Sequence, residues 1–387
     1  MKRLLVIDSS VSAKSPAMRG WLAAAPKILP QRFNEVEVWG FDCELIESWV
    51  KWTKIKPVSK RWAIQSIFYE REIRKKIERL SPSYLAETLI QTTGTHLVKT
   101  DIRFIHFWNT AYAEAAVARP DSLRPSILQR VFGNLIVRQE KEALISGNTQ
   151  EWWCVSRGIA APIVRDSKDE IIVRYLPNSY DPTRFNHSVR ANSRRKMRES
   201  FGFTSDEIIL GFSAFGHFER KGLRQAAQAV AELRAKGYAV RMLVLGGRSS
   251  AIQSFRSSML RRGIDTSGLH FAGLVNKMEN YLSAADAFFM PSHFEAFSLA
   301  EIEAAALGLR LYLTAHPGHE MILREGVNGR LLPWDPSGMA AILEKEIQLN
   351  IIRQTHSEMG EALVAESYTS TLASHYDSAI LRKWSDE

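Results

Sequence analysis

The sequence predicts an α/β protein made of two doubly wound domains, each with a parallel sheet that helices cover on both faces. Three observations support this prediction. The chain has 387 residues, which is more than one hydrophobic core ordinarily serves. Short apolar runs alternate with helix-like runs, as is typical of parallel sheets. A polar, proline-containing stretch at 177–196 interrupts this alternation and divides the chain in two.

The first half begins with the apolar run RLLVID at 3–8, which favours a buried strand over a signal peptide because the run is short. A serine-containing loop and a helix at 17–29 are expected to follow. Further strands are expected at 35–41, 101–108 and 151–156. We assign residues 1–180 to the first domain.

The second half repeats the alternation of strands and helices. Its strands are expected at 207–215, 240–247, 269–275 and 287–292, with helices at 223–237 and 278–286. We assign residues 181–365 to the second domain, and 366–387 to a terminal amphipathic helix that we expect to cross back to the first domain. Ligands bind beyond the carboxyl ends of strands in such sheets, so the expected site is the cleft between the domains.

Composition limits the class of protein. The chain is 45% apolar and 24% charged, as expected of a soluble protein, and it has no apolar run of about 18 residues. Cys43 and Cys154 lack metal-site spacing and fit a reducing cytoplasm. Residues 1–180 carry 27 Lys and Arg against 19 Asp and Glu, so this half is expected to meet an anionic partner. That partner could be a phosphorylated substrate, an anionic membrane or nucleic acid, although no nucleic-acid motif is present.

The stretch SHFEAFSLAEIEAAALG at 292–308 places three glutamates among apolar residues. Ser298 and Glu301 have the spacing of a capping box, and Gly308 suits a helix C-terminus, so a helix at 299–307 is predicted. Glu301 would then have a structural role.

Glu303 falls on the apolar face of that helix, where a carboxylate needs a partner. It would either pair with a buried arginine or hold a pair of ligand hydroxyls. Glu295 precedes the helix at the carboxyl end of a strand, and the amides of residues 297–300 form a helix N-terminus suited to phosphate. Sugar, phosphate and ribose groups at these positions would describe a nucleotide-sugar site.

Glu295 and Glu303 resemble the Glu-x7-Glu motif of retaining glycosyltransferases of family 4, which have the GT-B fold. The segments 175–185, 215–230 and 314–336 also resemble that family, in order and at its spacing, although Ser179 replaces a glycine. The Arg220-Lys221-Gly222 loop is similar to that of lipopolysaccharide core glucosyltransferases. The resemblance covers about residues 150–345.

The resemblance implies a role for each site residue. Glu303 should hold the ribose hydroxyls, Glu295 the donor sugar, and Arg220 and Lys221 the departing diphosphate, although these two could also form a solvated turn. It places the rest of the donor site at Gly216, Gly273, Leu274, Phe297, Ser298 and Leu299. It implies no metal, retained anomeric configuration, a UDP-sugar donor with GDP- or ADP-sugar as alternatives, and a cell-envelope glycan or glycolipid acceptor.

The first domain departs from the family. Its loop at 8–20 lacks the usual glycine pair, and Ser9, Ser10 and Ser12 would either donate hydrogen bonds to the ligand instead or form a turn. His106 ends a strand run and is the candidate for a catalytic histidine, with simple packing as the alternative. The segment 118–126 lacks a further expected His-Asp strand end. An inactive relative that serves as a binding or scaffold protein is therefore the alternative function.

Residues 49–80 contain ten Lys and Arg against three Glu. On a helix, Ile73, Ile77 and Leu80 would share a face with Trp62 and Tyr69. Such a segment suits an anionic membrane surface or a phosphorylated or lipid-linked acceptor. The alternative is a helix that packs on its own domain with a solvated basic face. We expect a cytoplasmic location, with peripheral contact at the inner face of the plasma membrane as the extension.

Overall fold

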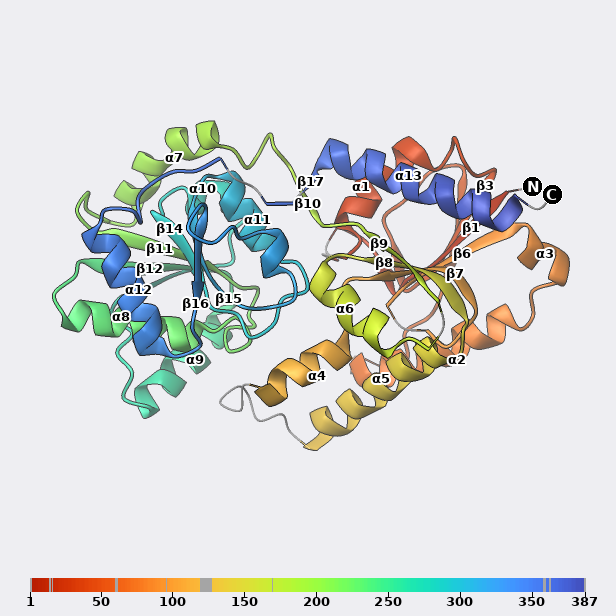
Figure 1. Ribbon diagram of the computed structural model, residues 1–387, viewed down its shortest axis with the longest axis horizontal. Helices are drawn as coiled ribbons and strands as arrows, with labels where there is room; N and C mark the ends of the chain where they lie inside the picture. Colours follow the sequence, from red (N-terminus) through yellow and green to blue (C-terminus); the bar gives the residue numbers. More distant parts are fainter. Residues whose placement is uncertain are drawn as a thin grey trace. The chain divides into compact units, whose positions relative to one another are not determined.

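The computed structural model describes residues 2–13, 15, 17–59, 62–94, 96–118, 127–168, 170–357, 360–361 and 363–385. It confirms the α/β class, with one large parallel sheet in each of two compact units (Figure 1). Unit 1 comprises Met1–Glu114, Pro125–Ser179 and Leu363–Glu387, and unit 2 comprises Ala115–Arg124 and Tyr180–Ala362. Among the described residues, no helix is long and apolar enough to cross a membrane.

The sheet of unit 1 has seven parallel strands in the order β5-β3-β1-β6-β7-β8-β9. They are β1 (Arg3–Ile7), β3 (Glu35–Gly40), β5 (Val50–Lys54), β6 (Thr88–Thr93), β7 (Thr100–Ile105), β8 (Thr149–Cys154) and β9 (Ile172–Tyr175). Successive strands add to one side of β1 and then to the other, so the strand order reverses between β1 and β6. The strands predicted at 3–8, 35–41, 101–108 and 151–156 are confirmed, whereas β5, β6 and β9 were not predicted.

Six helices in the described part of unit 1 are α1 (Arg19–Ile28), α2 (Trp62–Ile77), α3 (Pro82–Ala86), α5 (Ile127–Ile145), α6 (Arg157–Asp166) and α13 (Ala365–Trp384). A further helix, α4 (Asn109–Ala118), begins in unit 1 and ends in residues assigned to unit 2. The two ends of the sequence meet here, because α13 lies beside α1 (Figure 1). Tyr376 of α13 is fully buried, and its hydroxyl accepts from Trp21 Nε1 at 2.8 Å and donates to Gln91 Oε1 at 2.5 Å. These bonds join the terminal helix to the first helix and to β6.

The basic segment at 49–80 is a strand followed by a helix. Tyr69 and Ile73 of α2 pack on Leu5 and Ile90 of the central strands, and Ile77 and Leu80 pack at the edge of the same cluster. The side chain of Trp62 lies outside the described residues. Four basic side chains in and after this helix are exposed, as the alternative of a solvated basic face requires: Arg71, Arg74, Lys75 and Arg79. The helix therefore packs on its own unit and presents a basic outer face.

The sheet of unit 2 has six parallel strands in the order β13-β12-β11-β14-β15-β16. They are β11 (Ile208–Ser213), β12 (Val240–Leu245), β13 (Leu269–Gly273), β14 (Ala287–Met290), β15 (Arg310–Thr314) and β16 (Gly329–Leu332). The chain adds β12 and β13 on one side of β11 and then β14 on the other. The strand order therefore reverses between β11 and β14, which is the position where doubly wound sheets bind ligands.

Helices cover both faces of this second sheet (Figure 1). One face carries α8 (Leu223–Ala235), α9 (Ser249–Arg261) and α12 (Pro336–Gln348), and the other carries α7 (His187–Ser200), α10 (Met278–Leu282) and α11 (Leu299–Ala306). β14 is buried on all sides, as its sequence AFFM predicts for a strand in a sheet covered twice.

Candidate functional site

Two loops meet at the carboxyl ends of β11 and β14 in unit 2. The loop after β11 carries Arg220 and Lys221, and the loop after β14 carries Glu295. His293 N donates to Arg220 O at 2.8 Å and joins the two. Gly222 permits this approach, because its φ is +77° and a Cβ there would lie 1.9 Å from Pro291 O.

Glu295 is the centre of this contact. Its Oε1 accepts from Arg220 Nη1 at 2.8 Å and lies 2.9 Å from Lys221 Nζ. Arg220 Nη1 also donates to Phe294 O at 2.8 Å. Only 8% of Glu295 is exposed. Two cations around one carboxylate leave a net positive charge beside the N-terminus of α11, which suits a diphosphate.

The local charges shift the acidity of two groups. Burial alone would raise the pKa of Glu295, but the positive charges of Lys221 and Arg220 outweigh burial and hold that pKa below its usual value. Burial, followed by the same two cations, lowers the pKa of His217 in the loop after β11. Glu295 is therefore ionised and His217 neutral at neutral pH.

Glu303 lies on the buried face of α11, with 4% of its surface exposed, as the helical pattern predicted. A hydrogen bond from Arg184 to Glu279 raises the pKa of Arg184, and the charge of Glu303 contributes to the same shift. Arg184 therefore lies within the electrostatic reach of Glu303. Both predicted partners, a buried arginine and a ligand hydroxyl pair, are compatible with this position.

The capping-box prediction at Ser298 and Glu301 is wrong. Ser298 is the N-cap residue of α11, but its side chain makes no cap hydrogen bond. Glu301 is fully buried instead, and its Oε1 lies 3.2 Å from His316 Nε2 in the loop after β15. Because the surroundings are apolar, the carboxylate of Glu301 lies next to the basic side chain of His316 and not next to the backbone at the start of its own helix.

The predicted end of the same helix is confirmed. The helix stops at Ala306, and Gly308 follows with a φ of +75°. The predicted donor-site residues Phe297 and Ser298 are buried just before the helix, and Leu299 is its first residue.

Three further predicted residues follow the neighbouring strands. Gly216, with a φ of +94°, lies in the loop after β11. Gly273 ends β13, and its carbonyl accepts from Gly246 N at 2.6 Å at the end of β12. Leu274 comes next and is 51% exposed. All three therefore lie at the carboxyl edge of the sheet that also carries Glu295.

His106 belongs to unit 1, where it follows β7 as predicted. Its ring packs on Phe104 with the centroids 3.9 Å apart. Both ring nitrogens are buried, and neither has a hydrogen-bond partner among the described residues. Burial lowers the pKa of His106 to about 3, so the imidazole is neutral over the physiological range.

The serine loop of unit 1 forms a turn. Ser10 N donates to Asp8 Oδ1 at 2.7 Å, and Ser10 Oγ lies 3.2 Å from Ser12 Oγ. The short strand β2 (Ser10–Val11) then pairs with β4 (Asp42–Cys43). This supports the turn interpretation of the two possibilities. Most of the segment 118–126 lies outside the described residues.

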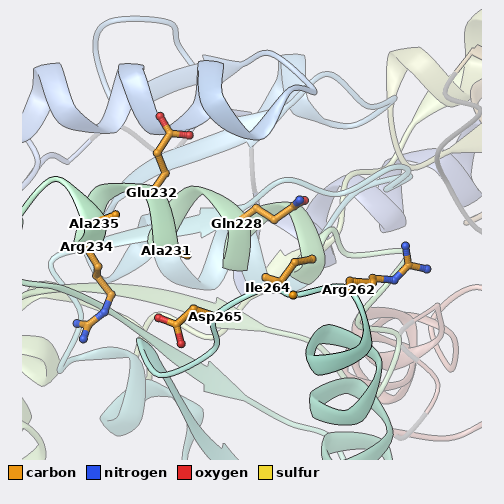
Figure 2. Close-up of a pocket in the computed structure, with 9 residues that line it drawn as sticks. Gln228, Ala231, Glu232, Arg234, Ala235, Arg262, Ile264 and Asp265 are labelled. Carbon is orange, nitrogen blue, oxygen red and sulfur yellow. The ribbon is translucent and has the colours of Figure 1, made fainter.

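A hollow of about 720 Å³ lies elsewhere in unit 2, between α8 and the turn after α9 (Figure 2). Gln228, Glu232, Arg234, Arg262 and Asp265 line it. These residues lie toward the amino ends of β12 and β13, at the edge of the sheet away from Glu295. We place the site at the carboxyl edge, because the paired charges and the strand-order reversal both occur there.

Two residues near the site were not assigned roles from the sequence. His316 lies behind Glu295, and Arg184 lies near Glu303. Arg184 and His316 lie in the segments 175–185 and 314–336, which resemble the family, but the resemblance implied no role for either residue. Among the described residues, no group of three or more His, Cys, Asp or Glu side chains is placed to hold a metal ion.

Comparison with known proteins agrees with this location. The family described as "Glycosyl transferases group 1" matches residues 207–348, which lie within unit 2 and contain Arg220, Lys221, Glu295 and Glu303. The D-inositol 3-phosphate glycosyltransferase of Xylanimonas cellulosilytica is 27% identical over 253 residues, which are 63% of this chain and 57% of that protein. The chain spans about half the length of the curated relatives that it matches.

Solved structures show the fold of the whole chain. The glycosyltransferase WaaG, involved in lipopolysaccharide biosynthesis, matches 97% of this chain and 95% of its own with a TM-score of 0.69 and 17% identity. Anabaena HepE, solved in complex with UDP-glucose, matches 98% of this chain and 100% of its own with a TM-score of 0.64 and 14% identity. The chain therefore has two Rossmann-like units with the GT-B fold, and the match to the glycosyl transferases group 1 family lies within unit 2.

Proposed function

We propose that this protein is a retaining glycosyltransferase that moves a sugar from a nucleotide-sugar donor to a cell-envelope glycan or glycolipid. The observation that supports this most strongly is the contact of Glu295 with Arg220 and Lys221 at the strand-order reversal of unit 2. The group 1 family match over the same residues supports it independently.

In this mechanism the bond between the anomeric carbon and the phosphate oxygen breaks, and the diphosphate leaves with the electron pair. Lys221 and Arg220 stabilise that charge, which is the largest catalytic contribution expected of such a site. The acceptor hydroxyl adds on the face that the diphosphate leaves, and its proton passes to the departing phosphate oxygen. Glu295 binds the sugar hydroxyls, and Glu303 binds the ribose.

His106 of unit 1 is assigned to a hydroxyl of the reacting sugar. A neutral imidazole can accept at one nitrogen and donate at the other, and both nitrogens of His106 lack a partner among the described residues.

UDP-sugar is the proposed donor, with GDP- and ADP-sugars as alternatives. HepE, which shares the fold, binds UDP-glucose. We propose that the reaction needs no metal, which predicts full activity after treatment with EDTA. We also propose a cytoplasmic location, with the exposed basic face of α2 at the inner membrane surface or at an anionic acceptor.

A thermal-shift screen of UDP-, GDP- and ADP-sugars tests the donor assignment, because a ligand of the folded state raises the melting temperature. Glu303→Gln should weaken binding of the stabilising nucleotide about 10-fold or more, since hydrogen bonds to a charged group contribute about 1.5–3 kcal/mol. Glu199→Gln is the matched control, because Glu199 is 70% exposed in the same unit. Equal affinity in the two variants would contradict the assignment of Glu303.

The alternative is an inactive relative that binds nucleotide-sugar or acts as a scaffold, and the serine turn at Ser10 favours it. Prolonged incubation with the stabilising UDP-sugar distinguishes the two functions. Release of UDP without an acceptor supports the enzyme, whereas binding with no hydrolysis and no transfer supports the scaffold.

A further inference from the structure

Glu301 is the third residue of α11 and is fully buried in unit 2. A buried carboxylate costs free energy unless a nearby group offsets it. The basic group that faces it is His316, whose side chain is also fully buried and whose Nε2 lies 3.2 Å from Glu301 Oε1. The pair is in close contact, but its angles are not those of a hydrogen bond, and neither Glu301 oxygen accepts one from a described residue.

The other nitrogen of His316 reaches the candidate site. Its Nδ1 lies 3.2 Å from the backbone oxygen of Glu295. A carbonyl oxygen only accepts, so Nδ1 carries a proton in this contact. Gly318 N donates to the same oxygen at 3.2 Å. The main chain of Glu295 is thus held by two donors from the loop after β15.

The two loops are packed too closely to move independently. A Cβ at Gly318 would lie 2.5 Å from Ala296 O and 2.8 Å from Phe297 Cα. Close-packed interiors transmit a displacement instead of absorbing it. A rotation of the His316 ring would therefore move the backbone that carries Glu295.

We propose that Glu301 is a positioning residue that acts through His316 to hold Glu295 at the donor sugar. This inference rests on the proposed function of Glu295. Two proton arrangements suit this 3.2 Å contact without a hydrogen bond: a carboxylate attracted to an imidazole that is protonated on both nitrogens, or a protonated carboxyl beside a bare Nε2. Both leave the proton on Nδ1, so Glu301 selects the form and the orientation of His316 that bind the Glu295 carbonyl.

The test compares Glu301→Leu, Glu301→Gln and the exposed control Glu199→Gln in the full-length protein. Glu301→Leu removes the partner of Nε2 and should lower kcat about 10- to 100-fold, because small misplacements at a reacting centre have effects of this size. UDP affinity should change less than about threefold, since the ribose is assigned to Glu303. Glu301→Gln should recover most of the activity, because its amide donates to Nε2 and keeps the Nδ1 proton.

A purely structural role gives a different pattern. If kcat, UDP affinity and thermal stability fell together in Glu301→Leu, or if kcat did not change, the proposal would be overturned. If that variant does not fold, nitrogen-15 NMR of the wild type still tests the proposal, because it reports whether His316 Nδ1 carries a proton. The His316 signals are assigned by their loss in His316→Asn. A protonated Nδ1 supports the proposal, and an unprotonated Nδ1 overturns it.

The failure of the proposed function is recognised separately. In that case the wild type neither binds a nucleotide-sugar nor transfers sugar, and the role assigned to Glu295 fails with it. A wild type that transfers sugar, together with a Glu301→Leu variant of unchanged kcat, would leave the proposed function intact and reject only the positioning role.

Discussion

The carboxylate of Glu295 is shared by Arg220 and Lys221, so this part of unit 2 keeps a positive charge although its groups are paired. Under the proposed function, an arriving diphosphate can take over one of these cations without leaving Glu295 unpaired. The carboxylate would thus hold the cations in place before the donor binds. Such preorganised charge is effective because it needs no rearrangement during the reaction.

Lys221→Ala should therefore lower kcat about 100- to 1,000-fold, since the departing diphosphate loses a charge that stabilises it. The measurement is steady-state transfer or donor hydrolysis with the nucleotide-sugar found in the screen. Lys236→Ala is the control, because Lys236 pairs with Glu344 in the same unit at a partly exposed position. Similar turnover in both variants would contradict a role for Lys221 in the reaction.

His106 permits a test based on pH. Burial lowers its pKa in the fold to about 3, below the ordinary value of 6.5, so the unfolded chain binds the additional proton as the pH falls from about 6.5 toward 3. The stability that the neutral imidazole contributes is present above pH 6.5 and is lost through this window. His106→Phe lacks this loss. Its free energy of unfolding in urea, relative to that of the wild type, should therefore increase as the pH is lowered from 7 to 4.5.

Activity separates packing from function at the same residue. If His106 contacts the reacting sugar, His106→Phe should lose turnover at pH 7 although its stability is retained. If the free energies of unfolding of the two proteins changed with pH in parallel, the His106 ring would not be desolvated in the fold. Full activity in a stable variant would leave His106 as a packed residue.

At the scale of elements, the site depends on how closely the loop after β11 approaches the loop after β14. Gly222 is the N-cap residue of α8 and lies against Pro291, the first residue after β14. Its positive φ and its lack of a Cβ are both needed there. The glycine therefore sets the distance between the cations and Glu295.

Gly222→Ala should destabilise unit 2 by about 2–4 kcal/mol, because left-handed strain and steric overlap add together. Gly237→Ala is the matched control. Gly237 has a φ of +91°, but a Cβ there would have no atom within 4 Å, so only the strain of about 1–2 kcal/mol applies. Denaturant unfolding measures both values, and equal losses would show that the approach to Pro291 does not matter.

The sequence predicted eight of the thirteen strands in the two large sheets, since buried parallel strands are continuous apolar runs, and it predicted the end of α11 at Gly308. It did not predict β5, whose sequence VKWTK is largely exposed and lacks an apolar run. The capping box failed because Ser298 and Glu301 have the right spacing, but spacing does not show that His316, fifteen residues after Glu301, offers the carboxylate a buried partner. Glu295 and the two cations were recognisable because the family resemblance implies a role for each of them, whereas it implies none for Arg184 and His316, whose contacts only the fold creates.

At the scale of the whole molecule, unit 1 is assembled from both ends of the sequence. Tyr376→Phe should destabilise unit 1 by about 2–6 kcal/mol, because buried groups of Trp21 and Gln91 lose their partner and each such loss costs about 1–3 kcal/mol. Calorimetry with and without the stabilising nucleotide checks this. In the variant, the transition whose melting temperature rises with nucleotide should keep its wild-type melting temperature. The other transition should have a lower melting temperature than in the wild type. A drop of the nucleotide-raised transition alone would contradict the prediction.

The position of α13 also has a consequence for synthesis on the ribosome. Residues 363–385 complete unit 1, but they are translated only after the whole of unit 2. Unit 2 can therefore reach its native state while the chain is still growing. The part of unit 1 that is synthesised earlier keeps the surface around Trp21 uncovered until α13 is made. We expect this uncovered surface to make the nascent first half depend on chaperones, and we expect a stall late in translation to release a species in which only unit 2 is folded.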